Sequence, residues 1–104
     1  MQAAYASEFS REMGCTVNEW LGWLPQAIGA HPWQREGDRV QIQLHNHSTL
    51  QGQLRIQWTV AEPRRIALVQ IPRLLVHFTF TGLDASQRYQ FMRRFDLYMQ
   101  RGGG

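Results

Sequence analysis

The last third of the chain constrains the fold most, because it contains a strand pattern followed directly by a helix pattern. Residues 74–81 alternate apolar and polar side chains, which is typical of a strand with one buried face. Asp84 and Gln87 then have the spacing of a helix N-terminal cap. A helix over 85–101 follows, with apolar residues on one face: Phe91, Met92, Phe95, Tyr98 and Met99. We expect this helix to end at Gly102 and to cover the apolar face of a sheet.

Two stretches in the middle of the chain alternate in the same way. Residues 39–45 and 50–60 each place aliphatic or aromatic side chains on one face and mostly glutamines on the other. Turn-forming residues at 46–49 separate them. Gly52 occupies an inward position in the second stretch, which predicts a bulge or the close approach of another element.

Two prolines indicate further interruptions of the sheet. Pro63 lies in a predicted turn at 62–64, and Pro72 precedes the strand at 74–81. We therefore expect residues 65–71 to form a third strand and residues 74–81 to form a fourth. Connections this short join only antiparallel neighbours, since a parallel crossover needs about a dozen residues. As an alternative, Pro72 lies at a bulge within one long bent strand, which leaves three strands.

The N-terminal third predicts two helices. Thr16 and Glu19 form a capping box that opens the second of them. Pro25 removes a backbone donor from that helix, so we expect a kink or a break near Leu24. The first, shorter helix is predicted over 3–13, where apolar residues recur at helical spacing: Tyr5, Phe9 and Met13.

These elements predict an α+β fold with the order α-α-β-β-β-β-α. Residues 33–38 are expected to be a polar link between the helical and the strand-forming halves. The sheet is a four-stranded antiparallel meander, and the helices pack on its apolar face to give a two-layer sandwich. The length of 104 residues predicts a single domain over 1–104.

Composition indicates a globular chain and a compartment. Hydrophobic residues make up 43% and charged residues 18%, which excludes the disordered class. Cys15 is the single cysteine, so an intramolecular disulfide is excluded and a reducing compartment fits. The sequence shows no signal peptide and no run of the roughly 18–20 apolar residues that a membrane span needs, so we expect a cytoplasmic protein. All eleven basic residues are arginine, which is typical of a GC-rich bacterial genome.

The sequence predicts no catalytic residue, no metal ligand and no cofactor. His45 and His47 have a spacing at which two side chains can share a metal, but a site needs about three or four ligands. Cys15 precedes a helix start, a position that can lower a thiol pKa, yet no histidine adjoins it. Phosphate-binding glycine motifs are absent from the sequence. Whether the chain is an enzyme stays open, and a non-catalytic role is favoured.

The leading hypothesis is a protein-interaction or scaffold module, as a homodimer or as a subunit of an assembly. Two groups of residues motivate it, because arginine is enriched at interfaces and a polar sheet face is left uncovered. The first group lies on the outward side of the C-terminal helix: Arg94, Leu97 and Arg101. The second group lies on the polar sheet face: Gln53, Arg55 and Gln57.

Two alternatives use the arginines differently. Nucleic acid could bind the arginine-bearing helix and the Gln/Arg sheet face, although the net charge of +3 is small and no aromatic residue is predicted on the outer face. A small anionic ligand could instead contact Arg88, which falls within the apolar stripe of the C-terminal helix. The structural interpretation of Arg88 is a side chain with a packed stem and a solvated head.

Overall fold

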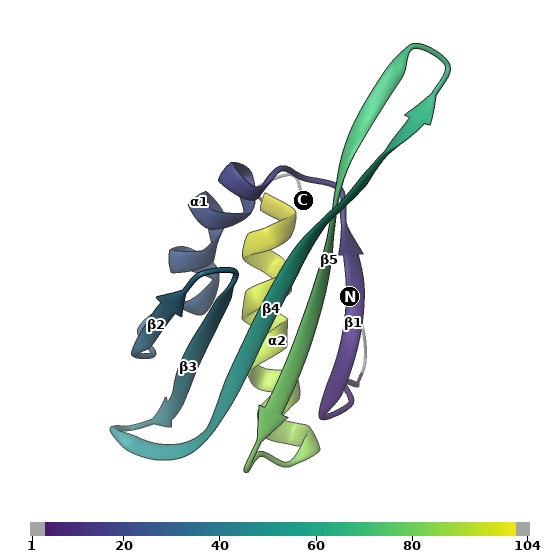
Figure 1. Cartoon of the computed structure of the whole chain (residues 1–104). Helices are drawn as coiled ribbons and strands as arrows, with labels where there is room; N and C mark the ends of the chain where they lie inside the picture. The colour runs from purple at the N-terminus through teal and green to yellow at the C-terminus, as the bar shows by residue number, and fades with distance from the viewer. Residues whose placement is uncertain (1–3, 102–104) are drawn as a thin grey trace.

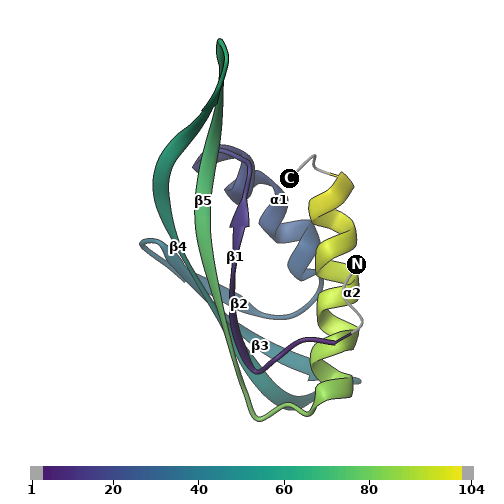
Figure 2. The same ribbon diagram turned by 90° about the vertical axis from the view of Figure 1, so that its right-hand side faces the viewer.

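The computed structural model describes residues 4–101, which form one antiparallel sheet covered on one face by helices (Figures 1 and 2). The described elements are β1 (Glu8–Met13), α1 (Val17–Ile28), β2 (Trp33–Glu36), β3 (Arg39–Asn46), β4 (Thr49–Ile66), β5 (Val69–Thr81) and α2 (Ala85–Arg101). The strand order is β1-β5-β4-β3-β2. The predicted α+β class and antiparallel sheet are confirmed, but the described residues give five strands and two helices rather than four and three. The expected helix stop at Gly102 lies outside the described residues.

The core forms between the inner face of the sheet and the two helices. Trp20 of α1, Phe78 of β5 and Phe95 of α2 are fully buried. Their rings meet edge to face, with centroids 6.1 Å apart for Trp20 and Phe95 and 5.6 Å apart for Phe78 and Phe95. The predicted inward face of α2 is confirmed, since Phe91 and its apolar neighbours are buried and Tyr98 is half-buried.

Both predicted helix starts are confirmed by reciprocal hydrogen bonds. The Thr16 hydroxyl accepts from the backbone N–H of Glu19, whose carboxylate accepts from the Thr16 N–H. Asp84 and Gln87 exchange the same pair of bonds, both at 2.9 Å. Of the kink or break expected near Leu24, the break is wrong, because α1 continues through Pro25 to Ile28, and the kink stays a prediction. Burial of four side chains in α1, worth about 1.5–3 kcal/mol for each large one, outweighs the single backbone bond that proline removes.

The helix predicted over 3–13 is wrong, because β1 occupies residues 8–13 and pairs antiparallel with β5 from Glu8↔Thr79 to Met13↔Leu74. Phe9 and Met13 satisfy a period of four, but they also lie on one face of a strand. Arg11 lies between them on the same inward face, and its charge interrupts the apolar/polar alternation that would indicate a strand. The inward position is possible because Arg11 pairs with buried Asp96 on α2.

The turn predicted at 62–64 is wrong, as is the division of 65–71 and 74–81 into separate strands. The alternative for Pro72 is confirmed in part, since Pro72 lies within one long strand, β5, opposite a register shift. β4 runs through Pro63 and β5 runs through Pro72, and the chain reverses at 67–68 instead. Neither proline pairs in the ladder, because the register shifts between Ala61 and Arg64. Proline is tolerated at both positions, because β3 pairs with β4 only as far as Gln57 and β1 pairs with β5 only as far as Leu74, so no third strand needs the missing N–H.

The remaining turns follow local chemistry. The segment expected as a polar link contains β2, which pairs with β3 from Trp33↔Ile42 to Glu36↔Arg39. The turn predicted at 46–49 is confirmed, with positive φ at His47 and Ser48. The close approach at Gly52 is also confirmed, since a Cβ there would collide with the Thr81 carbonyl oxygen.

Candidate functional site

A two-stranded hairpin arm, residues 60–73, projects from one end of the sheet (Figure 1). β1 pairs with β5 only as far as Leu74, and β3 pairs with β4 only as far as Gln57. Beyond these points β4 and β5 pair with each other alone, ending at Ile66↔Val69. The arm accounts for the elongated shape of the described residues, whose principal extents are 50 × 29 × 22 Å.

The sequence of the arm explains why it stands apart from the sheet. Pro63 and Pro72 remove backbone donors where the arm begins, and the register shift at this point adds local twist. The reversal places Ala67 at a φ of 53°, in the left-handed region. Such a short connection matches the twist of the two strands and keeps them paired to the tip.

The arm is unusually apolar for a segment in solvent. Among residues 4–101, seven large apolar side chains are exposed, and four of them belong to the arm: Val60, Ile66, Leu68 and Val69. Leu68 at the tip is 102% exposed, so nothing in the described chain covers it. Leu75 adds a further exposed apolar side chain next to the base of the arm. Exposed apolar side chains that gather at one place, as Ile66, Leu68 and Val69 do at the tip, mark an interaction site more often than a solvated face.

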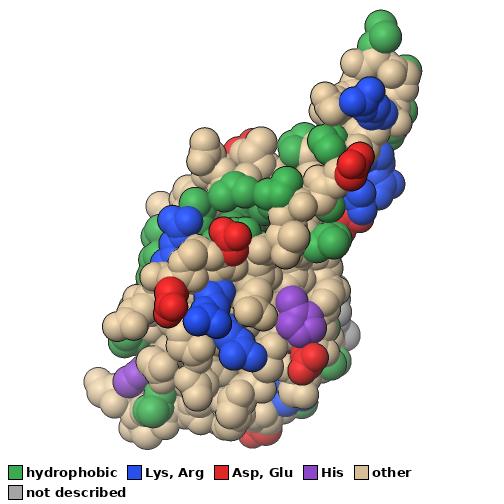
Figure 3. Space-filling model, in the orientation of Figure 1, with side chains coloured by type: hydrophobic (Ala, Val, Ile, Leu, Met, Phe, Trp, Pro, Cys, Tyr) green, Lys and Arg blue, Asp and Glu red, His purple; other side chains and the backbone are tan. Residues whose placement is uncertain are grey.

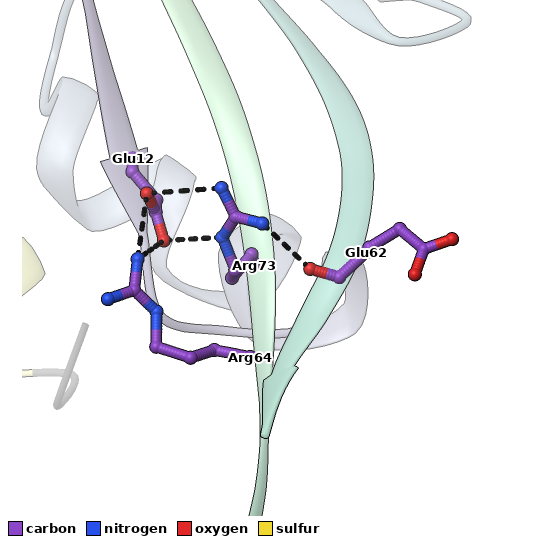
Figure 4. Close-up of polar contacts among 4 residues, drawn as sticks. All are labelled: Glu12, Glu62, Arg64 and Arg73. Atoms are coloured by element: carbon purple, nitrogen blue, oxygen red, sulfur yellow. Dashed lines mark hydrogen bonds and ion pairs between the residues drawn. The ribbon is translucent and has the colours of Figure 1, made fainter. Parts of the chain in front are cut away.

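An ion-pair cluster holds the base of the arm against β1 (Figure 4). Glu12 lies 2.6 Å from Arg73 Nε and 3.1 Å from Arg64 Nη2. Arg73 also donates to the carbonyl oxygen of Glu62, at 3.0 Å. The hydrogen bond from Arg73 is the main reason that the pKa of Glu12 lies below its usual range, and Arg64 adds to the effect.

The arginines predicted on α2 make contacts within the chain. Arg94 Nη2 donates to the Gln26 carbonyl at the end of α1, at 3.2 Å, and its guanidinium lies 4.5 Å from the centre of the Tyr98 ring. Arg101 lies 5.3 Å from the same ring. Leu97, 39% exposed, lies between them in sequence. The role of these three residues in partner binding stays a prediction.

The predicted residues of the sheet lie on its outer face, on β4. Gln53 accepts a hydrogen bond from Gln41 of β3, at 2.6 Å, while Arg55 and Gln57 are exposed. These side chains form a polar surface beside the arm rather than part of it. Their participation in binding also stays a prediction.

Arg88 contacts the backbone on both sides of the first turn of α2. Its Nε donates to the Tyr5 carbonyl and its Nη1 to the Leu83 carbonyl, both at 2.9 Å. These bonds connect the segment before β1 to the start of α2. The guanidinium therefore has a structural role, and contact with an anion remains a prediction that no observation tests.

Sequence reasoning missed Asp96, the one charged or polar side chain that is buried within residues 4–101. The Tyr5 hydroxyl donates to its Oδ2 at 2.5 Å, and Arg11 Nη1 donates to its Oδ1 at 2.6 Å. The signal was its spacing, because residue 96 follows Met92 by four positions on the inward face of α2. The cluster joins β1 and the preceding segment to α2 and is a structural anchor.

The described residues offer little for catalysis or metal binding. Residues 4–101 contain no group of three or more histidine, cysteine, aspartate or glutamate side chains suited to a metal ion. Cys15 is buried, which raises the pKa of its thiol to about 11, with a smaller contribution from Glu19. This thiol stays protonated near neutral pH and is not an activated nucleophile. Within the same residues, neither helix has the length and apolarity to cross a membrane.

Comparison with known proteins found no matching family model, curated protein or solved structure. The geometry of the chain therefore carries the functional argument, and the hairpin arm is the feature that core packing does not explain.

Proposed function

We propose that the chain is a protein-interaction module that associates as a homodimer, with the hairpin arm as its contact surface. Leu68 carries the proposal, because a fully exposed leucine at the tip of a projecting arm loses its contact with water only when another molecule covers it. Ile66 and Val69 pair across the strands just below the tip and extend the same surface.

The backbone of the arm supports contact through side chains rather than through addition of a strand. Both edges of the arm lack a neighbouring strand, and such edges normally invite pairing with another chain. Pro63 and Pro72 interrupt the donors along these edges, one on each strand. A symmetric dimer through apolar side chains fits this surface, and two-fold dimers are the commonest closed assemblies.

The experiment compares two leucine substitutions by size-exclusion chromatography with light scattering. Leu68→Ser removes the apolar tip of the arm, whereas Leu97→Ser removes an exposed leucine on α2, the helix that the sequence alone favoured. We expect the unaltered chain and Leu97→Ser to be dimers and Leu68→Ser to be a monomer with an unchanged melting temperature. Dissociation by Leu97→Ser instead of Leu68→Ser would move the contact to α2.

Nucleic acid is the second candidate, because two arginines lie on a two-stranded ribbon of the kind that can enter a DNA groove. Arg64 and Arg65 are both exposed on the arm. The carboxylate of Glu12 already neutralises part of this charge through Arg64 and Arg73, which favours a protein contact. Fluorescence anisotropy with short RNA and DNA at low salt tests whether the arm binds nucleic acid. The absence of salt-dependent binding eliminates this candidate.

A further inference from the structure

A depression lies on the outer face of the sheet at the base of the arm, and it has a volume of about 690 Å³. Figure 3 shows apolar side chains gathered at the base of the arm, with acidic and basic side chains around them. The depression is lined by apolar and charged residues from β4, β5 and the turn between β2 and β3: Glu36, Asp38, Arg39, Trp58, Leu75 and His77.

The charges of the depression leave one carboxylate uncompensated. Glu36 pairs with Arg39 at 3.4 Å, and His77 contacts Glu8 at 3.2 Å. Asp38 makes no ion pair with any residue from 4 to 101, and its carbonyl accepts from the Trp58 N–H at 3.0 Å, which fixes the turn against β4. Leu75 is the exposed apolar residue of this lining, since Trp58 and Val76 are buried, and Asp38 is its carboxylate without an ion pair.

The arm has the complementary character. Arg64 is held by Glu12, whereas Arg65 makes no ion pair among the described residues 4–101. Next to Arg65, the tip presents exposed Ile66, Leu68 and Val69. An apolar tip with one uncompensated arginine matches an apolar depression with one uncompensated carboxylate, and such complementarity selects and orients a partner.

The length of the arm permits the apolar contact between its tip and the depression. Ile66, near the tip, lies seven positions after Thr59, at the depression, which corresponds to about 23 Å of strand. When two arms lie side by side in opposite directions, the tip of each reaches the base of the other. The depression adjoins that base through Thr59 and Leu75.

We propose that the depression at the base of the arm is the receptor for the arm tip of a second copy of this chain, so that two copies exchange arms reciprocally. This inference rests on the proposed homodimer and adds the surface that the arm contacts. A two-fold axis makes the contact occur twice, so each copy contributes one tip and one depression.

Cysteine cross-linking tests the contact directly, because the natural thiol of Cys15 is buried and unreactive. Val69→Cys and Leu75→Cys are made as separate variants and mixed. The mixed dimers are dissociated and allowed to reassociate, so that copies exchange, and are then treated with a short thiol-reactive cross-linker. We expect the mixture to give a cross-linked dimer of one copy of each. A mixture of Val69→Cys with Leu97→Cys is the matched control and should give at least tenfold less product.

The outcomes separate this inference from the homodimer itself. A dimer in which Val69→Cys cross-links to Leu97→Cys, or to neither position, overturns the arm-to-depression contact and leaves the homodimer standing. A chain that stays monomeric overturns both. Leu68→Cys in place of Val69→Cys provides a second tip position and should cross-link to Leu75→Cys as well.

Discussion

Glu12 of β1 and Arg73 of β5 form a 2.6 Å ion pair at the point where the hairpin arm leaves the sheet. Arg64 reaches the same carboxylate from β4, so one acidic side chain contacts both strands of the arm (Figure 4). The pairing fixes the direction of the arm relative to the body. The proposed arm exchange depends on that direction, because a freely hinged arm would lose conformational entropy on binding.

Glu12→Gln should loosen the base of the arm without unfolding the core. The neutral amide keeps the size of the side chain but loses the charge-assisted hydrogen bonds from Arg64 and Arg73. We expect faster hydrogen exchange at the amides of 64–71, with unchanged exchange in α2. Glu8→Gln, which removes an exposed carboxylate at the other end of β1, is the control. Equal exchange in the arm of Glu12→Gln and the unaltered chain would show that the cluster does not restrain it.

The same cluster predicts a pH dependence of arm rigidity. Because hydrogen bonding lowers the pKa of Glu12 in the folded chain, its contribution is fully present above the pKa of an unfolded glutamate. The contribution is lost as the pH falls through the lower folded value. Exchange in the arm, corrected for its intrinsic pH dependence, should therefore rise in the acidic range in the unaltered chain and stay flat in Glu12→Gln. Parallel profiles for the two proteins would contradict this assignment.

Asp96→Asn should destabilise the fold far more than a surface substitution. The amide cannot compensate the charge of Arg11, whose side chain is only 21% exposed, and breaking a buried pair costs about 3 kcal/mol. Tyr5→Phe removes one neutral donor to the same carboxylate and should cost about 1 kcal/mol. Urea unfolding measures both, and the reverse order of the two losses would show that Arg11 is not the main partner.

Charge reversal should change which copies associate. Arg65→Glu and Asp38→Arg each place like charges at both contacts of a homodimer and should weaken it at least tenfold. Mixed together, the two variants form a heterodimer in which both contacts again join opposite charges. Native mass spectrometry of the mixture should show mainly the heterodimer. Statistical mixing of the three dimers would mean that these two residues do not meet.

The elements that the sequence predicted correctly depend on local chemistry. The capping pairs at Thr16 and Asp84 and the apolar face around Phe95 are set by residues within one or two helical turns. The errors arose where distant partners decide the structure. Arg11 looks misplaced in a strand until Asp96, 85 positions later, pairs with it. Pro63 argues against a strand only where a neighbouring strand needs its backbone N–H, and β3 ends before it reaches Pro63.

The candidate site was missed for the same reason. Leu68 is exposed because the chain turns there, beyond the last residues of β4 and β5 that β3 and β1 pair with. The sequence around Leu68 does not indicate where those neighbouring strands end. The pattern of 65–71 accordingly predicts an ordinary core strand, while the structure leaves it as an exposed arm.

Sedimentation equilibrium of the unaltered chain over a wide dilution series tests self-association most directly. The chain has a mass of 12.2 kDa, and we expect twice that mass at micromolar and higher concentrations, with dissociation on dilution. A mass of 12.2 kDa at every concentration would contradict the homodimer and, with it, the exchange of arms.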